Sequence, residues 1–164
     1  MINRFGQLDH LLPVLSPADI STSDTNTVLV NLSGAHRCTF EVSLGTVTCA
    51  STTTPIFTVL AATSAATTTA TAIAFKYRKS GIVGVDTYEE VADATSSGLT
   101  ITKDTDVDKV ILIDVDPAVV AAAKADCRWV YVHIDTAATI SALEVGVNAR
   151  VEPRYIAATP ESAT

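Results

Sequence analysis

The sequence predicts an all-β fold, either an antiparallel β-sandwich or a Greek-key-like barrel. Residues 37–44 and 142–151 alternate between apolar and polar side chains, which is the pattern of a strand with one buried face. About eight segments of this kind follow one another between turn-forming residues, as in sandwiches and barrels. Only residues 117–124 have a convincing helical pattern, so a parallel sheet built from alternating strands and full helices is disfavoured.

A length of 164 residues fits one domain. We expect an irregular N-terminal arm at 1–26, a single β domain at 27–156 and a C-terminal tail at 157–164. In the arm, Pro13 and Pro17 interrupt an apolar stretch, and a polar, turn-rich run follows. Its apolar side chains are too numerous for a free linker: Leu8, Leu11, Leu12, Val14 and Leu15. The arm is therefore expected to lie on its own domain or on a neighbouring molecule.

The strands are marked by runs of β-branched and aromatic residues between glycine, proline or serine clusters. The clearest predicted strands are 28–31, 37–44, 56–62, 73–78, 99–102, 109–115, 128–135 and 142–151. Weaker candidates are 46–50, after Gly45 ends the preceding strand, and 85–91. The Ala/Thr/Ser-rich residues 63–71 are expected to form an exposed loop, with a weak helical turn as the alternative.

The later elements differ in their expected burial. Residues 109–115 are nearly continuously apolar, which predicts a central strand covered on both faces. Asp116 can cap a helix at 117–124 and Pro117 suits its first position, and about two turns make this helix a connector. The last strand has one apolar face, which we expect to point inward: Leu143, Val145, Val147, Ala149 and Val151.

Composition limits the possible partners. A net charge of −7 and the lack of a basic stripe disfavour nucleic acid. No apolar run approaches the ~18 residues that span a bilayer, and the first residues do not resemble a secretory signal. Three cysteines without a CxxC motif indicate reduced, buried thiols made in a cytosol. Charged residues are only 18% of the chain, so we expect part of its surface to be covered.

No catalytic motif is present: the sequence lacks a GxSxG elbow, an HExxH pair and a phosphate-cradling GxxxxGK[ST] loop. His133 and Asp135 share a strand face and could be a base and its orienting group. An ordinary surface or core-edge pair is the alternative that we favour. The sequence therefore predicts a protein that is not an enzyme and needs no cofactor.

Alternating carboxylates at Asp104, Asp106 and Asp108 resemble the start of a calcium loop. The match then fails, because Lys109 stands where the turn of such a loop requires glycine and Val115 stands where a bidentate glutamate should close it. The other interpretation is a solvated, charge-balanced entry into the next strand.

Two groups that mix cations with aromatic rings are candidate contact patches, since Arg and Tyr are enriched in protein interfaces. The first is Tyr77 with Arg78 and Lys79, and the second is Arg150 with Arg154 and Tyr155. Ordinary strand-edge residues are the alternative. Together with the apolar arm, these residues form the predicted interface.

The order of segments is similar to that of head decoration (cement) proteins of tailed bacteriophages. The segments that carry the likeness are His36–Val42, the Ala/Thr-rich turn before Ile73–Lys79, Val110–Val115 with Asp116-Pro117, Trp129–Ile134 and Val151–Tyr155. The resemblance spans roughly residues 28–156. It implies a structural virion protein, often a homotrimer, that is made in the host cytoplasm and binds the major capsid protein on the outer capsid surface.

Three alternatives remain open. One is a tail-tube or fibre-associated virion component, although residues 63–71 look too short for the long hairpin of a tube protein. Another is a non-catalytic β-sandwich binding module for carbohydrate, against which stands the expected burial of Trp129. The last is an enzyme that uses His133.

Overall fold

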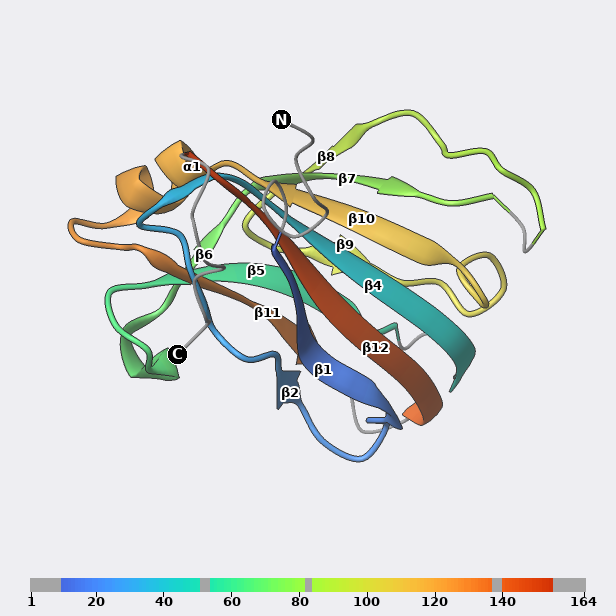
Figure 1. The fold of residues 1–164 in the computed structure, drawn as a ribbon. Coiled ribbons are helices and arrows are strands. Elements are labelled where there is room, and N and C mark those ends of the chain that lie inside the picture. The colour runs from blue at the N-terminus through green and yellow to red at the C-terminus, as the bar shows by residue number, and fades with distance from the viewer. Residues whose placement is uncertain (1–9, 51–53, 82–83, 137–139, 155–164) are drawn as a thin grey trace.

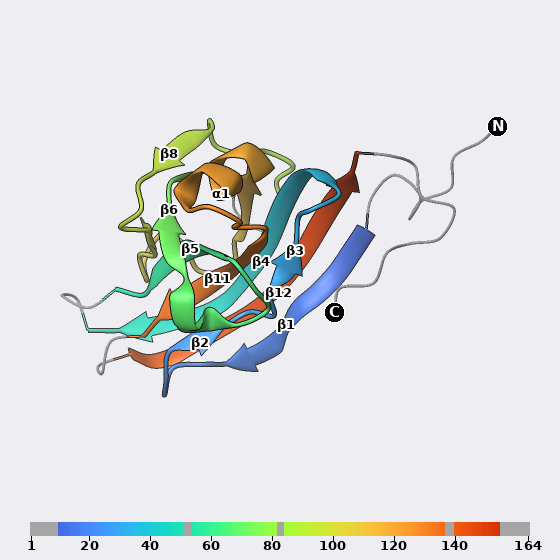
Figure 2. The same cartoon turned by 90° about the vertical axis from the view of Figure 1, so that its left-hand side faces the viewer.

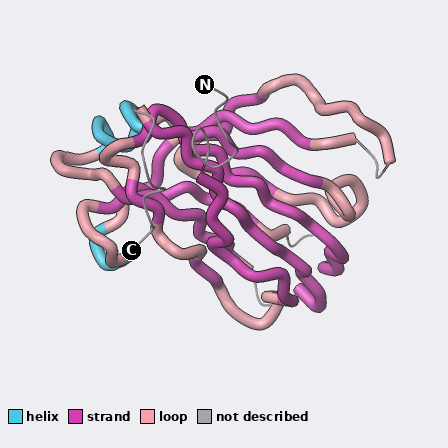
Figure 3. Tube along the Cα trace, viewed as in Figure 1, coloured by secondary structure: helices cyan, strands magenta, loops and turns pink. Residues whose placement is uncertain are grey.

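Two antiparallel sheets pack face to face in the computed structural model, which describes residues 10–50, 54–81, 84–136 and 140–154 (Figures 1 and 3). Sheet A has the strand order β1-β12-β4-β10-β7-β8, and sheet B has the order β2-β11-β5-β6 with β3 paired to β11 and β9 paired to β5. One short helix, α1, packs against β4 of one sheet and β6 of the other. The predicted all-β sandwich is confirmed.

The strands of sheet A are β1 (His10–Asp19), β4 (Ala35–Cys49), β7 (Phe75–Lys79), β8 (Ala92–Ala94), β10 (Val110–Val115) and β12 (Ile140–Pro153). Those of sheet B are β2 (Thr25–Asn26), β3 (Val30–Asn31), β5 (Ile56–Ala62), β6 (Thr71–Ile73), β9 (Leu99–Thr100) and β11 (Trp129–Asp135). The helices are η1 (Thr67–Thr69), a single 3-10 turn, and α1 (Pro117–Ala123). Figure 2 shows the two layers from the side.

The core lies between the sheets and is filled by alternate residues of each strand. Phe40 of β4 and Ile113 of β10 in sheet A, and Phe57 of β5 in sheet B, belong to this core, and all three side chains are fully buried. The five inward-facing residues expected for the last strand are all buried in β12. The predicted helix is also present: Asp116 accepts a hydrogen bond from the Ala118 N–H at 2.8 Å, and Pro117 occupies the first turn.

The prediction of an irregular arm is wrong for residues 10–19. These residues form β1, which pairs with β12 from His10 opposite Val151 to Asp19 opposite Glu144. The register shifts on either side of Leu15, next to the two prolines, and an edge strand tolerates proline because its outer N–H groups need no partner. Val14 is buried and Leu12 and Leu15 pack on the core, so this stretch covers its own domain. Leu8 and residues 157–164 lie outside the described residues.

Gly45 does not end its strand, because β4 continues to Cys49 and absorbs the separate strand expected at 46–50. The partner strand is irregular here, with a register shift between Leu143 and Val145. The side chain of Glu144 lies over Gly45 and accepts a hydrogen bond from the Thr46 N–H at 3.2 Å. A Cβ on Gly45 would lie 2.7 Å from Glu144 Oε2, so glycine serves here to admit that side chain.

Two further predicted strands need correction. Residues 73–78 are two strands, because the chain passes at Ala74 from β6 in sheet B to β7 in sheet A. Strand β10 is central, between β4 and β7, but only one of its faces is covered, and Leu112 on the other is half-exposed. Residues 85–91 contribute only an isolated bridge from Tyr88 to Ser80.

All three cysteines are buried and unpaired, as expected for reduced thiols. Burial raises the pKa of the Cys38 thiol to about 12, and the nearby negative charge of Asp114 adds to the effect. A group with a raised pKa in the folded state contributes stability below its unfolded value, near 9 for this thiol, and that stability is lost as pH rises toward 12.

We therefore expect the free energy of unfolding to fall above pH 9 in the wild type. The decrease in the free energy of unfolding between pH 7 and high pH should be smaller in Cys38→Ala than in the wild type. Urea titrations between pH 7 and 11 measure this difference. Parallel pH curves for the wild type and Cys38→Ala would contradict the assignment of the raised pKa to Cys38. Cys127→Ala is the control for the removal of a buried thiol elsewhere in the core.

Candidate functional site

The outer face of sheet A carries rows of polar side chains. Over residues 38–44 of β4, 110–115 of β10 and 147–151 of β12, every second residue points away from the core, because the residues between them are buried. The strand registers place these side chains in rows that cross the sheet. The two rows are Arg150, Thr39, Asp114 and Lys76, and then Asn148, Glu41, Leu112 and Arg78.

Ion pairs orient three cations of this face, Arg37, Arg150 and Lys76. Arg37 donates two hydrogen bonds to Asp114, at 2.6 and 2.7 Å, and these bonds raise the pKa of the guanidinium. Arg150 lies 3.1 Å from a Glu41 oxygen. A two-point Arg–carboxylate bond fixes orientation as well as distance. Lys76 and Asp93 form a third pair, at 2.6 Å, on the same face.

The structure brings together two residues that the sequence placed in separate patches. Arg78 of β7 and Arg150 of β12 both line a shallow depression of about 270 Å³, and Arg37 of β4 completes it. The Arg78 guanidinium also lies over the ring of Tyr88, 5.7 Å from its centroid. Sequence reasoning did not select Arg37 or Tyr88.

Two other predicted contact residues, Tyr77 and Arg154, have structural roles. Tyr77 lies on the inner side of β7, where it packs edge-to-face against Phe75 with ring centroids 6.5 Å apart. The Arg154 Nε donates to the carbonyl oxygen of Ala35 at 3.0 Å, which holds the end of β12 against β4. Leu11 is 45% exposed at the sheet edge. Tyr155 lies outside the described residues.

The three aspartates of the calcium-like run do not converge. Asp106 is buried, lies 2.7 Å from Lys79 Nζ and accepts a hydrogen bond from the Thr102 N–H at 2.8 Å. Asp104 and Asp108 are exposed. Among the described residues no group of three His, Cys, Asp or Glu side chains is arranged to hold a metal ion. Asp106 therefore acts as an internal counter-ion that closes the loop before β10.

His133 is oriented by an amide rather than by a carboxylate. Its Nδ1 lies 2.7 Å from Asn26 Oδ1, whereas Asp135 at the end of β11 is exposed. This geometry gives no base with an orienting carboxylate. Trp129, expected to be buried, is partly exposed at the start of the same strand.

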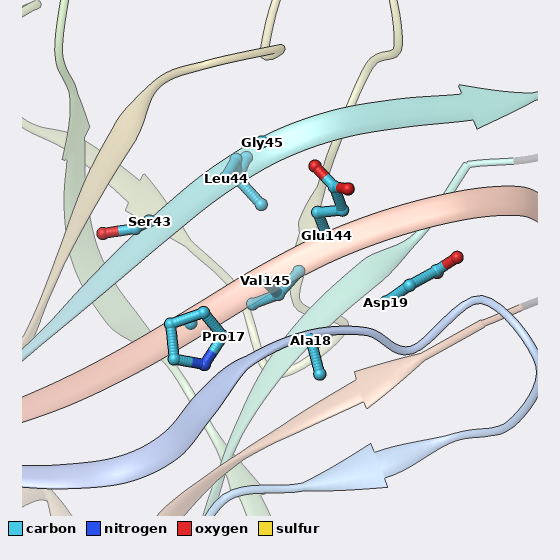
Figure 4. Close-up of a pocket in the computed structure, with 9 residues that line it drawn as sticks. Pro17, Ala18, Asp19, Ser43, Leu44, Gly45, Glu144 and Val145 are labelled. Carbon is cyan, nitrogen blue, oxygen red and sulfur yellow. The ribbon is translucent and has the colours of Figure 1, made fainter.

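A trough of about 340 Å³ lies where β1, β12 and β4 run side by side (Figure 4). Its sides include Pro17, Glu144 and Gly45, and its rim includes Asp19. The Leu143 and Ser21 N–H groups bond to Asp19 and lower the pKa of its carboxyl group. Gly146 also lines the trough, and a Cβ at this position would lie 2.9 Å from Pro17 Cγ. Close packing of β1 against β12 therefore accounts for the shape of the trough.

A larger cavity, of about 720 Å³, lies between α1 and the β7–β8 edge. Phe75, Ala94 and Val119 supply its apolar lining, and its carboxylates are Asp93, Asp114 and Asp116. Each carboxylate already has a partner: Lys76, Arg37 and the Ala118 N–H respectively. The cavity can take an apolar group, but it presents no arrangement for chemistry.

No family model matches this chain, and comparisons with curated proteins and with solved structures find no match. In the described part of the chain, no helix has the length and apolarity needed to cross a membrane. Fold and surface together define a two-layered β-sandwich with an arginine-bearing outer sheet face. Its function has to be inferred from that surface.

Proposed function

We propose that this chain is a structural virion protein, a decoration (cement) protein that binds the major capsid protein lattice of a tailed phage. The observation that carries the proposal is the outer face of sheet A, where Arg37, Arg78 and Arg150 meet around one depression. Arginine is among the residues enriched at protein interfaces. The ion pairs of Arg37 and Arg150 reduce the side-chain entropy that binding would otherwise remove.

The charge of this face also supports docking against a protein. Four of the eleven Lys and Arg residues lie on it, against five carboxylates: Glu41, Asp93, Asp114, Glu144 and Glu152. The chain as a whole carries a charge of −7, so most of the excess negative charge lies elsewhere. A near-neutral face on an acidic protein is where another protein surface can approach with least repulsion.

The mechanism follows from linkage. A protein that binds the assembled lattice but not its separated subunits stabilises the assembled state. Repetition over a shell multiplies the effect, and trimerisation would add multivalency because each trimer is held by several contacts. The homotrimer and the location on the outer capsid surface belong to this proposal.

Co-sedimentation with expanded empty shells of the encoding phage tests the proposal. We expect the wild type to bind and the pair Arg78→Glu/Arg150→Glu to bind at least tenfold more weakly. Exposed ion pairs contribute roughly 0–1 kcal/mol to folding, so the variant should keep its melting temperature within a few degrees. Arg128→Glu is the matched control, since this exposed arginine precedes β11 in the other sheet.

A wild-type protein that stays in the supernatant would overturn the proposal. Equal binding by the double variant would instead remove the outer face of sheet A from the contact. Light scattering on the free protein tests the trimer separately.

The cavity beside α1 favours a second candidate, the non-catalytic binding module. Its volume of about 720 Å³ is in the range of small-ligand sites. A glycan array tests it: binding by the wild type that is lost in Ala74→Trp, which fills the cavity, would favour the module. Absence of binding would remove this candidate for carbohydrates.

A further inference from the structure

Residues 84–91, which lead into β8, extend as a loop beyond the end of sheet A (Figure 1). Backbone hydrogen bonds hold the base of this loop as a ribbon, from the Gly81 N–H to the Thr87 carbonyl at 2.7 Å and from the Glu89 N–H to the Lys79 carbonyl at 2.8 Å. Two hydrogen bonds hold Ser80 to β10, because its N–H donates to the Val110 carbonyl and its Oγ accepts from the Val110 N–H. The described residues of the loop are therefore anchored to the sheet.

Exposed apolar side chains gather on this loop. Seven large hydrophobic side chains are exposed in the described part of the chain, and three of them are here: Val85 at 54%, Tyr88 at 45% and Val91 at 57%. Tyr88 contacts Arg78, so the loop continues the outer face of sheet A. Clustered apolar exposure of this kind is typical of interaction sites, whereas single exposed residues are not.

The charges of the loop have one sign. Residues 80–91 include Asp86, Glu89 and Glu90 and no lysine or arginine. Within the described residues only Glu89 has an ion-pair partner, Lys109, at 3.0 Å. Two carboxylates thus flank the apolar side chains without a countercharge from the described chain.

We propose that residues 84–91 of the loop are the anchor that this protein inserts into an apolar groove with a basic rim on the capsid protein. This inference rests on the proposed function and names the part of the contact that supplies its apolar area. The apolar side chains would fill the groove and the two carboxylates would meet its rim. The hydrogen-bonded base limits the entropy lost on docking, since it already holds Thr87 and Glu89 in place.

A second copy of this chain is a poorer occupant, because its own hollows carry carboxylates. The trough at the sheet edge has Asp19 and Glu144, and the cavity beside α1 has Asp93, Asp114 and Asp116. With a net charge of −7 on each chain, an acidic loop would approach an acidic wall. The complementary partner is a basic-rimmed surface on another protein.

The test is the same co-sedimentation with empty shells, applied to full-length variants of the loop. Val85→Ser/Val91→Ser removes apolar contact, and we expect at least tenfold weaker binding. Val28→Ser is the matched control, since Val28 is 58% exposed far from the loop in sequence and should bind like the wild type. Asp86→Lys/Glu90→Lys should also weaken binding, with Asp104→Lys as its exposed acidic control.

Each result decides one point. If the wild type binds and Val85→Ser/Val91→Ser binds equally well, the loop inference is overturned and the proposed function stands. If the wild type does not bind, both fall. A concentration-dependent dimer in light scattering that the loop substitutions abolish would assign the loop to a second copy and overturn the inference. Melting temperatures within about 2 °C of the wild type would show that the variants are folded, as expected for surface changes.

Discussion

Replacing Asp106 by alanine is expected to lower the free energy of unfolding by about 3–5 kcal/mol, because it leaves a lysine without its buried counter-ion. The Asp106 side chain is 1% exposed and that of Lys79 is 13% exposed, with 2.7 Å between Oδ2 and Nζ. The same carboxylate accepts the Thr102 N–H at 2.8 Å. The substitution therefore removes a charge pair and a backbone hydrogen bond at once.

Urea denaturation and thermal melting measure this effect. For a chain of this size, about 3–5 kcal/mol corresponds to a melting temperature roughly 6–20 °C lower. Asp104→Ala, on the same loop but exposed, should change stability by no more than about 0.5 kcal/mol. If the two variants melted together, Asp106 would not be the counter-ion of Lys79.

A double variant separates the pair from the rest of the loop. Lys79→Met/Asp106→Leu removes both charges and should recover part of the loss, since replacing both partners by apolar groups is far less costly than removing one. The double-mutant cycle compares this double variant with the single variants Lys79→Met and Asp106→Leu. The coupling energy between the two positions should be about 1–3 kcal/mol. Additive losses would indicate that the two side chains act independently.

The strands with one polar face were predictable because their alternation records burial directly. Residues 142–151 show which side of β12 faces the core, and the structure confirms each inward residue. The capped helix was predictable for a similar reason, because Asp116 and Pro117 act within one turn. Local rules suffice where the deciding contacts are local.

Strand β1 could not be predicted, because its deciding contact is distant. Its prolines are unfavourable in a central strand and tolerable at an edge, and the edge position follows only from pairing with β12, more than a hundred residues away. The same holds for Asp106. The sequence does not distinguish the three alternating aspartates, and only the ion pair with Lys79 of β7 shows that Asp106 is the buried one. In both cases the partner comes from elsewhere in the chain.

The candidate site was predictable in part. Arg78 and Arg150 were selected as separate patches, and only the strand registers reveal that they share one face. Arg37 could have been found, because it stands on the polar side of an alternating strand with Thr39 and Glu41. Tyr88 gave no such signal, since the described part of its loop has a single ladder contact, an isolated bridge to Ser80.

Gly98→Ala is expected to lower the free energy of unfolding by about 3 kcal/mol, for two separable reasons. Gly98 has a φ of +90°, and a side chain at positive φ adds roughly 1 kcal/mol or more of strain. An added Cβ would also lie 2.7 Å from the Phe57 carbonyl oxygen, which is backbone of β5 and cannot turn aside. Forcing atoms into such a position destabilises a protein by about 1–3 kcal/mol.

Gly84→Ala separates the two reasons. Gly84 has nearly the same backbone angle, φ of +86°, but nothing lies within 4 Å of the place that its Cβ would take. Its substitution should destabilise by about 1 kcal/mol or less, because strain is partly offset by the lower entropy of the unfolded chain. Urea titration of both variants measures the two losses in free energy of unfolding. Equal losses would show that backbone strain, and not the close approach to Phe57, makes alanine unfavourable at position 98. A large excess for Gly98→Ala would show that the turn before β9 is closed by contact with β5, so that glycine at 98 is required by packing between the turn and the sheet.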